Sequence, residues 1–473
     1  MALNTPAAAP NGSVSDFLRA IWLAVGGDAG SVSGVEVTGE GDLPSVFAVS
    51  DLVTGAAGAA ALAVAEFVGT TAPRRAAVRV DRRLVSYWAG RSIKPEGWSV
   101  PPLWGGIAGD YLAADGWIKL HTNSPHHRKA ALAALGVADD KETVRAAVAR
   151  WHADELEAAI LAQGGCAATM RSQQAWAEHP QGNAVATEPL VHREMAQAAK
   201  RKQRAFDPAR PLAGLRVLDL TRIIAGPVAT RFLAGFGAEV LRIDPPGWEE
   251  PSLQADVTLG KRCARLDLRD AGDRERFIGL LAGADVIVHG YRPGALEGLG
   301  LGAELRRRVR PGIVDVSLDA YGWTGPWAGR RGYDSLVQMS SGIADEGMRR
   351  YRKDQPTPLP VQALDHATGY IVAAAAVRGL TGRLVSGAAS TMRASLARTA
   401  ALLASAGPRD GAGTLAKPGP TDFSDRIEQT PWGRAHRLRP PVTVDGAIMH
   451  WDRPSTTLGS SSPNWENPAE NSQ

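Results

Sequence analysis

Residues 215–244 have the sequence LRVLDLTRIIAGPVATRFLAGFGAEVLRID, and this stretch decides the fold. Apolar residues alternate in 215–220 and again in 238–244, which is typical of strands, whereas 228–236 predicts a short helix that Gly237 ends. Strand, helix and strand within 30 residues form a βαβ unit, which requires a parallel sheet. We also expect strands at 264–268, 285–289 and 312–318, with helices at 274–281 and 303–310. The sequence therefore predicts an α/β protein with a doubly wound parallel sheet.

The rest of the chain divides around this unit. A polar, basic stretch from His192 to Arg210 predicts a solvated helix that leads into a linker. Before it, we expect a long helix at 48–68, a hairpin at 111–121, helices at 128–135, 141–151 and 153–162, and a smaller α+β domain. The predicted segments are a disordered N-terminus (1–14), a first unit (15–190), the linker (191–210), the α/β domain (211–405), a C-terminal segment (406–454) and a disordered tail (455–473).

Composition limits the classes of function. The 473 residues carry a net charge of only +4, and the basic residues are scattered, so we expect no nucleic-acid partner. Two cysteines, Cys166 and Cys263, do not make a disulfide framework, which favours a reducing cytoplasm. The N-terminus lacks a basic start followed by an apolar core, and no uncharged apolar run approaches the roughly 18 residues of a membrane span. We therefore expect a cytoplasmic protein that does not enter a membrane.

Two Ala-rich helices are predicted to begin with the same pattern. Asp51-Leu-Val-Thr-Gly55 and Asp365-His-Ala-Thr-Gly369 share D-x-x-T-G. The shared polar positions favour an internal repeat over a chance likeness of Ala-rich sequence.

The βαβ unit also suggests a dinucleotide site, with Asp244 placed to bind a ribose hydroxyl. The turn argues against this, because it reads TRIIAGPVA instead of G-x-G-x-x-G. Pro227 in that turn has no backbone N–H to offer a pyrophosphate. A strand that simply ends at Asp244 is the simpler interpretation.

A series of short motifs extends over residues 211–334: PLAGLRVLDLT (211–221), AGP (225–227), GAEVLRID (237–244), GKR (260–262), LDL (266–268), YRPGA (291–295), YG (321–322), TGP (324–326) and GYD (332–334). In their order and spacing, these motifs resemble the class III CoA-transferase family.

The resemblance implies a coenzyme A site at the strand ends. The matching positions are Arg222, Ala225, Arg242, Lys261, Arg262, Tyr291 and Arg292, with Arg242 and Lys261 as the first choices. Arginine suits this polyanionic ligand because it makes bidentate phosphate contacts. Coenzyme A would be a substrate, and we expect neither a permanently bound cofactor nor a metal.

The resemblance also implies the chemistry. Asp365 occupies the position of the family's nucleophile, which attacks an acyl-CoA thioester and passes CoA through an aspartyl intermediate to a carboxylic acid. A helix N-terminus favours the ionised carboxylate that this attack needs. The alternative for Asp365 is an ordinary helix cap.

The order of segments departs from the family's, because features of its small domain come first here. Gly105 and Gly106 resemble the loop that covers the active site in relatives, and they follow Asp51, which is therefore the second candidate nucleophile. Relatives form interlocked dimers, so the resemblance implies a homodimer.

Two other functions remain open. An acyl-CoA racemase would need a His where this chain has Tyr333, and the permuted order would also suit a non-catalytic acyl-CoA-binding subunit. His121, His126 and His127 match no usual zinc spacing and predict a surface helix start.

Overall fold

The computed structural model describes residues 12–70, 76–198 and 206–466. Its centre is a seven-stranded sheet in the order β10-β9-β8-β11-β12-β13-β7, which confirms the predicted α/β class. The first six strands are parallel, and only β7 is antiparallel to its neighbour. The strands are β7 (His192–Ala198), β8 (Arg216–Leu220), β9 (Glu239–Asp244), β10 (Lys261–Arg265), β11 (Val286–His289), β12 (Val314–Asp319) and β13 (Ala388–Ser395).

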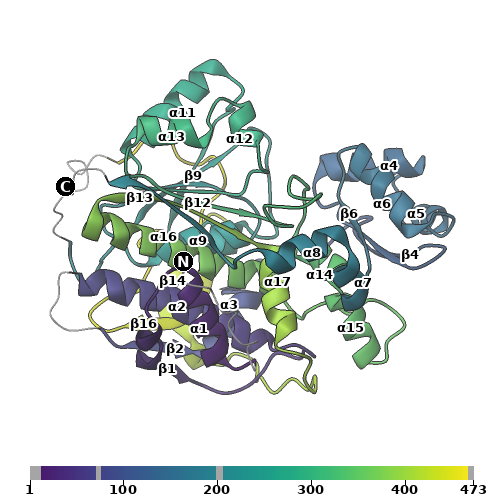
Figure 1. The fold of residues 1–473 in the computed structure, drawn as a ribbon, viewed down its shortest axis with the longest axis horizontal. Helices are drawn as coiled ribbons and strands as arrows, with labels where there is room; N and C mark the ends of the chain where they lie inside the picture. The colour runs from purple at the N-terminus through teal and green to yellow at the C-terminus, as the bar shows by residue number, and fades with distance from the viewer. Residues whose placement is uncertain (1–11, 71–75, 199–205, 467–473) are drawn as a thin grey trace.

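Successive apolar side chains along these strands point alternately to the two faces of the sheet, so both faces are buried. Val217 and Val288 belong to one core cluster, whereas Leu218 and Ile287 belong to another, because successive side chains point to opposite faces. Helices cover both faces (Figure 1). On one side lie α11 (Ala271–Gly283), α12 (Ala295–Gly298) and α13 (Ala303–Val309), and on the other lie α9 (Ala225–Gly235) and α16 (Ala363–Ser386).

The two D-x-x-T-G helices pack against each other. Helix α2 (Val49–Gly69) lies along α16, and α1 (Val14–Ala24) covers α2. Within the described residues, α2 is the one helix long and apolar enough to cross a membrane by length and composition, yet 89% of that window is buried. Its apolar surface is therefore accounted for by packing inside this fold.

The segments at the two ends of the chain share small sheets. One joins β1 (Val35–Thr38) and β2 (Val78–Asp81) to β16 (Val442–Val444), and another joins β3 (Ile93–Pro95) to β14 (Phe423–Thr430) and β15 (Gly433–Leu438). Between β2 and β3 lies α3 (Arg82–Gly90). The short elements nearby are η1 (Ala29–Gly34), α10 (Gln254–Val257), α17 (Leu396–Ser405) and η2 (Pro420–Asp422).

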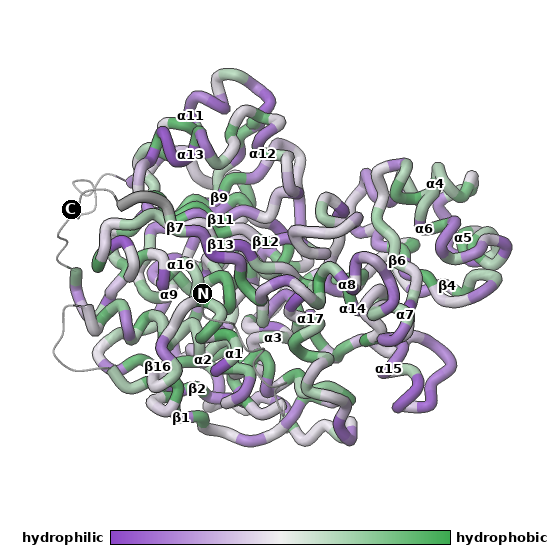
Figure 2. Tube along the Cα trace, in the orientation of Figure 1, coloured by the Kyte–Doolittle hydropathy of each residue, from purple (hydrophilic) through white to green (hydrophobic). Residues whose placement is uncertain are grey.

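A small α+β lobe stands at one end of the molecule (Figure 1). The predicted hairpin is confirmed as β4 (Gly109–Leu112) paired with β5 (Trp117–Leu120). The lobe adds α4 (Pro125–Leu135), α5 (Lys141–Val148), α6 (Ala153–Ala162) and β6 (Ala167–Thr169), and it connects through α7 (Gln173–Glu178) and α8 (Pro180–Thr187) to the sheet. Helices α14 (Asp334–Ser340) and α15 (Ile343–Arg350) return from the α/β part to pack beside it. Figure 2 shows hydrophilic residues concentrated around α15 and on the outer helices α11 and α13.

Three local expectations differ from the structure. The stretch predicted as a solvated helix contains strand β7, because pairing with β13 satisfies its backbone; residues 199–205 lie outside the described part. Strand β10 begins at Lys261, three residues before the predicted start, where its backbone meets β9. Residues 455–466, expected in a disordered tail, lie against the protein, where Ser455 is fully buried and the indole of Trp465 donates to the carbonyl of Leu280 at 2.9 Å.

Candidate active site

A large cavity lies where the parallel strands end. This cavity of about 710 Å³, the strand-end cavity, is lined by residues that follow β8, β9, β10, β11 and β12. The chain runs outward from β8 to β10 in one direction and from β11 to β13 in the other. Such a reversal opens a crevice at the carboxyl ends of the strands, where ligands bind in doubly wound sheets.

Arg222 projects into this cavity between two aromatic rings. Its Cζ lies 5.0 Å from the ring centroid of Trp248 and 5.3 Å from that of Tyr291. Its Nη2 donates to the hydroxyl of Tyr291 at 3.1 Å. The next residue, Ile223, has φ of 67°, a strained conformation for a β-branched residue that is found most often at functional sites. The loop after β8 is thus held in an unusual shape that presents a cation.

Other predicted residues surround the same cavity. Ala225, Tyr291 and Arg292, three of the positions that the resemblance implies for coenzyme A, line it. Three arginines and an indole that the prediction missed also line it: Arg269, Arg330, Arg331 and Trp248. Together they make a cationic and aromatic surface suited to phosphates and a flat base.

Arg242 and Lys261, the first choices for phosphate binding, do not reach the cavity. Arg242 is fully buried, and its guanidinium contacts Asp244 at 2.8 Å and Glu250 at 2.5 Å. Lys261 Nζ lies 3.0 Å from Asp219 Oδ2, with both side chains fully buried. Each cation already has a buried carboxylate partner, so these residues form structural ion pairs instead.

Arg262 also lies outside the cavity. Its guanidinium donates to the carbonyls of Ser462 and Asn464 at 3.2 Å and 2.6 Å. Lys261 and Arg262 begin strand β10, in which successive side chains point to opposite faces. The motif alone therefore did not reveal which of them would face the ligand.

Asp365 lies at a junction between two cavities. It occupies the first turn of α16 and lines both the strand-end cavity and a second cavity of about 400 Å³, the acid cavity. Gly105 and Gly106 line the acid cavity, as does Trp104. The predicted loop and the first-choice nucleophile are therefore brought together.

The surroundings of Asp365 disfavour its charge. Burial raises the pKa of this carboxyl well above its usual value, and the neighbouring carboxyl of Asp334 raises it further. A backbone hydrogen bond from Ala225, the first residue of α9, acts in the opposite direction. The sequence predicted that the helix N-terminus would favour the ionised form of Asp365. This prediction is wrong, because burial raises the pKa of Asp365 more than the helix terminus lowers it.

Asp334, at the start of α14, positions the neighbouring backbone. Its Oδ2 accepts from the backbone N–H of Asp365 at 2.9 Å, and its other oxygen accepts from Gln338. Burial raises the pKa of Asp334 as well. Two buried carboxyls so close together are a common feature of acid–base and nucleophilic sites.

Asp51, the second candidate, has no access to either cavity. Its oxygens accept from Arg82 at 2.7 Å and from Arg409 at 2.5 Å. Asp51 therefore forms ion pairs with two cations beside α2. Of the two aspartates in the repeated pattern, Asp365 lines cavities and Asp51 belongs to an ion-pair cluster.

The histidines expected at the surface form part of the cavity walls. His121 and His127 are buried, and His121 stacks on Tyr333 with ring centroids 3.9 Å apart. Burial lowers the pKa of both to about 3, so they are neutral at physiological pH. In the part of the chain that the structure describes, no cluster of His, Cys, Asp and Glu is arranged to hold a metal.

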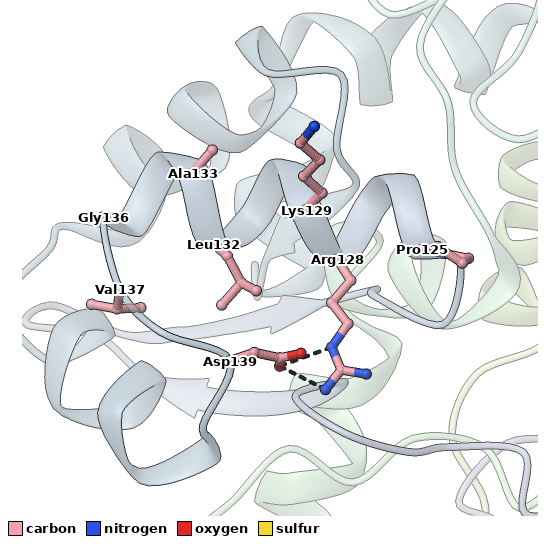
Figure 3. A pocket seen from close by; sticks show the side chains of 8 residues that line it. All are labelled: Pro125, Arg128, Lys129, Leu132, Ala133, Gly136, Val137 and Asp139. Atoms are coloured by element: carbon pink, nitrogen blue, oxygen red, sulfur yellow. Dashed lines mark hydrogen bonds and ion pairs between the residues drawn. The ribbon is translucent and has the colours of Figure 1, made fainter.

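A shallower hollow of about 530 Å³ lies on the far side of Arg128 (Figure 3). Arg128 donates to Asp139 at 2.8 Å and also lines the acid cavity. The hollow is lined mainly by α4, and its carboxylate, Asp139, is paired with Arg128, so we place the candidate site at Asp365.

Comparison with known proteins agrees with this geometry. A family model described as CoA-transferase family III matches residues 212–435. The chain is 37% identical over 186 residues to acetyl-coenzyme A transferase nodX of Hypoxylon pulicicidum, covering 38% of this chain and 31% of that protein. It is 34% identical over 200 residues to succinyl-CoA:glutarate CoA-transferase of Mus musculus, covering 40% and 45%.

A solved structure is also similar. The crystal structure of Rv3272 from M. tuberculosis matches with 32% identity and a TM-score of 0.37, over 41% of this chain and 56% of that one. This chain thus spans between about a third and about half of the length of these relatives. Over residues 212–435, the chain is similar to CoA-transferase family III.

Proposed function

We propose that this protein transfers coenzyme A from an acyl-CoA thioester to a carboxylic acid, with Asp365 as the nucleophile. The observation that carries the proposal is the position of Asp365, which borders both the strand-end cavity and the acid cavity. A carboxylate at that junction can reach a thioester from one side and an acid from the other. The similarity to CoA-transferases of known name supports the same reaction class.

The strand-end cavity would hold coenzyme A. The phosphates would contact Arg222 and the neighbouring arginines, and Trp248 and Tyr291 offer flat surfaces for the adenine. The pantetheine arm would then extend toward Asp365. Arg222 is held by Tyr291 before any ligand binds, so little side-chain freedom remains to be lost on binding.

The transfer itself would proceed in balanced steps. The Asp365 carboxylate attacks the thioester carbonyl, forming an acyl-aspartyl anhydride and releasing CoA thiolate. The thiolate then attacks the aspartyl carbonyl, which frees the donor acid and leaves an aspartyl-CoA thioester. The acceptor carboxylate attacks this thioester, and the released thiolate finally takes the acyl group from the new anhydride, which restores Asp365.

The raised pKa of Asp365 suits this role. A desolvated carboxylate is a stronger nucleophile than a hydrated one, since its charge is poorly stabilised before attack. Neutralising that charge in the anhydride relieves the repulsion from Asp334. The Ala225 N–H, already directed at the carboxyl, is in place to hold a developing oxyanion.

The test is to trap the aspartyl intermediate. Protein incubated with an acyl-CoA and hydroxylamine should acquire a hydroxamate at Asp365, detected by mass spectrometry of its peptide, and should lose activity as the label forms. Asp365→Asn should show neither label nor turnover. Asp51→Asn is the matched control, because it alters the equivalent aspartate of the repeated helix. Label at Asp51, or full turnover by Asp365→Asn, would refute the assignment.

A further inference from the structure

A third cavity of about 300 Å³, the inner cavity, lies beyond the acid cavity. The two share Leu103, Trp104, Ile224, Leu253, Ser335 and Gln362 in their walls. The inner cavity therefore adjoins the space beside Asp365, and Arg231 of α9 forms part of its wall.

Arg231 is a buried cation without a carboxylate partner among the described residues. Arg231 is only 4% exposed to solvent. Its Nη1 donates to the backbone carbonyl of Asp256 at 2.9 Å, and its guanidinium lies 4.5 Å from the ring centroid of Trp88. Other buried arginines of this protein differ, since Arg242 and Arg306 contact carboxylates directly. Burial accordingly lowers the pKa of Arg231.

The other charged groups of the inner cavity have partners. Lys119 Nζ lies 2.5 Å from Asp110, and Asp256 accepts from the backbone N–H of Ser92 at 2.9 Å. Asp256 also lies 3.6 Å from Arg437. His366 is neutral, since burial lowers its pKa to about 3. Asp256 attracts the guanidinium of Arg231 through space, but no direct ion pair joins them. Among the described residues, Arg231 is thus the cation of this cavity without a carboxylate in direct contact.

The distance along α9 fits a short bifunctional molecule. Ala225 contacts Asp365 through its backbone, and Arg231 follows six residues later on the same helix. Six residues rise about 9 Å along a helix axis. His366, the residue after Asp365, lines the inner cavity together with Arg231. A molecule with one carboxyl at Asp365 and a second anionic group a few carbons away can therefore place that group in the cavity that Arg231 lines.

We propose that the inner cavity binds the second carboxylate of a dicarboxylic acid, with Arg231 as its partner. This inference rests on the proposed function, because Asp365 must handle the first carboxyl. An arginine fork pairs with a carboxylate through two parallel hydrogen bonds. An acid bound in this way removes the cost of the buried, unpaired guanidinium.

The first experiment compares a dicarboxylic acceptor with its own monoester. Glutarate and monomethyl glutarate have the same chain but differ in the charge at the far end. The unmodified protein should use glutarate with the higher kcat/KM, and Arg231→Gln should lower that value roughly 10- to 100-fold, as expected for a charge-assisted hydrogen bond. The value for the monoester should stay unchanged, and Arg231→Lys should recover part of the preference. Equal losses on both acceptors, or no preference in the unmodified protein, would overturn the proposal.

Arg398→Gln is the matched control. Arg398 is also partly buried and donates to a backbone carbonyl, that of Glu188 at 2.8 Å, but it lines none of the three cavities. Its substitution should leave the ratio of the two acceptors unchanged. A changed ratio in this variant would show that the ratio reports general loosening, and would count against the role of Arg231.

A second readout does not need turnover. Calorimetric titration of glutarate into Asp365→Asn should show millimolar or tighter binding that Arg231→Gln, added to the same variant, removes. If no CoA transfer occurs with any acid while this binding difference persists, the proposed function fails and the anion site stands. If transfer occurs but glutarate does not bind in an Arg231-dependent way, the anion site fails alone.

Discussion

Replacing Lys261 by Met tests whether this residue forms a structural ion pair or contacts the ligand. Lys261 Nζ lies 3.0 Å from Asp219 Oδ2 and 3.0 Å from the carbonyl of Pro227, and its residue is 1% exposed. Met has a similar length without the charge, so Lys261→Met removes the cation in direct contact with the fully buried carboxylate of Asp219 and leaves only the more distant charge of Arg242. Breaking one side of such a pair costs about 3–5 kcal/mol in the free energy of unfolding.

Although Lys261→Met lowers the free energy of unfolding, it should leave the affinity for coenzyme A unchanged. Lys261 does not line the strand-end cavity, whereas Arg222 does. In Lys261→Met, the dissociation constant of CoA should stay near that of the parent, measured by calorimetry on folded protein. Arg222→Gln should show the reverse: roughly 10- to 100-fold weaker CoA binding, with a loss of at most about 1 kcal/mol in stability from its two ring contacts.

Urea unfolding followed by tryptophan fluorescence measures the stability, and a double variant checks its cause. Adding Asp219→Asn to Lys261→Met removes the orphaned charge and should restore part of the lost free energy of unfolding. The reasoning is refuted if Lys261→Met unfolds at the parent's urea concentration while its CoA affinity falls tenfold, because Lys261 would then be a phosphate ligand.

Three further predictions concern the two aspartates of the repeat and the neighbour of one of them. Asp334→Asn removes the carboxyl that raises the pKa of Asp365, so the acid limb of the pH–rate profile should move to lower pH; an unmoved limb would contradict the assignment. Asp51→Asn should cost about 2 kcal/mol of stability by leaving Arg82 and Arg409 poorly paired, with CoA transfer retained; loss of transfer in folded protein would restore Asp51 as a candidate. Asp365→Asn should raise the urea midpoint at pH 8. The folded-state pKa of Asp365 lies above its unfolded value, so its charged form destabilises the fold as pH rises above the unfolded value of about 4, and the gain should vanish below that pH. A gain of equal size at pH 3 would contradict this account.

The sequence was most informative where local pattern and three-dimensional position coincide. Alternating apolar residues predicted β8 and β9, and the turn between them was identified together with Arg222. Tyr291 and Arg292, which the family resemblance implied as coenzyme A contacts, line the cavity at that edge of the sheet, where residues that follow parallel strands gather.

Positions within strands and contacts between distant segments were harder to infer. Arg242 and Lys261 match family motifs, yet the direction of a strand side chain depends on neighbours such as Glu250 that no local pattern reveals. Asp334 lies 31 residues before Asp365 in the chain, and Arg231 sits in the middle of an otherwise apolar helix. These residues become significant only when the cavities are in view.

The junction at Asp365 has a consequence for unwanted hydrolysis. The Asp365 carboxyl forms part of the wall of both the strand-end cavity and the acid cavity. A bound acyl-CoA therefore excludes water from only one side of this carboxyl. The other side stays open to water until an acid fills the second space, and water competes there with the acceptor for the aspartyl anhydride or thioester. The acid therefore excludes water as well as reacting, and hydrolysis of the acyl-CoA should fall as the acceptor concentration rises.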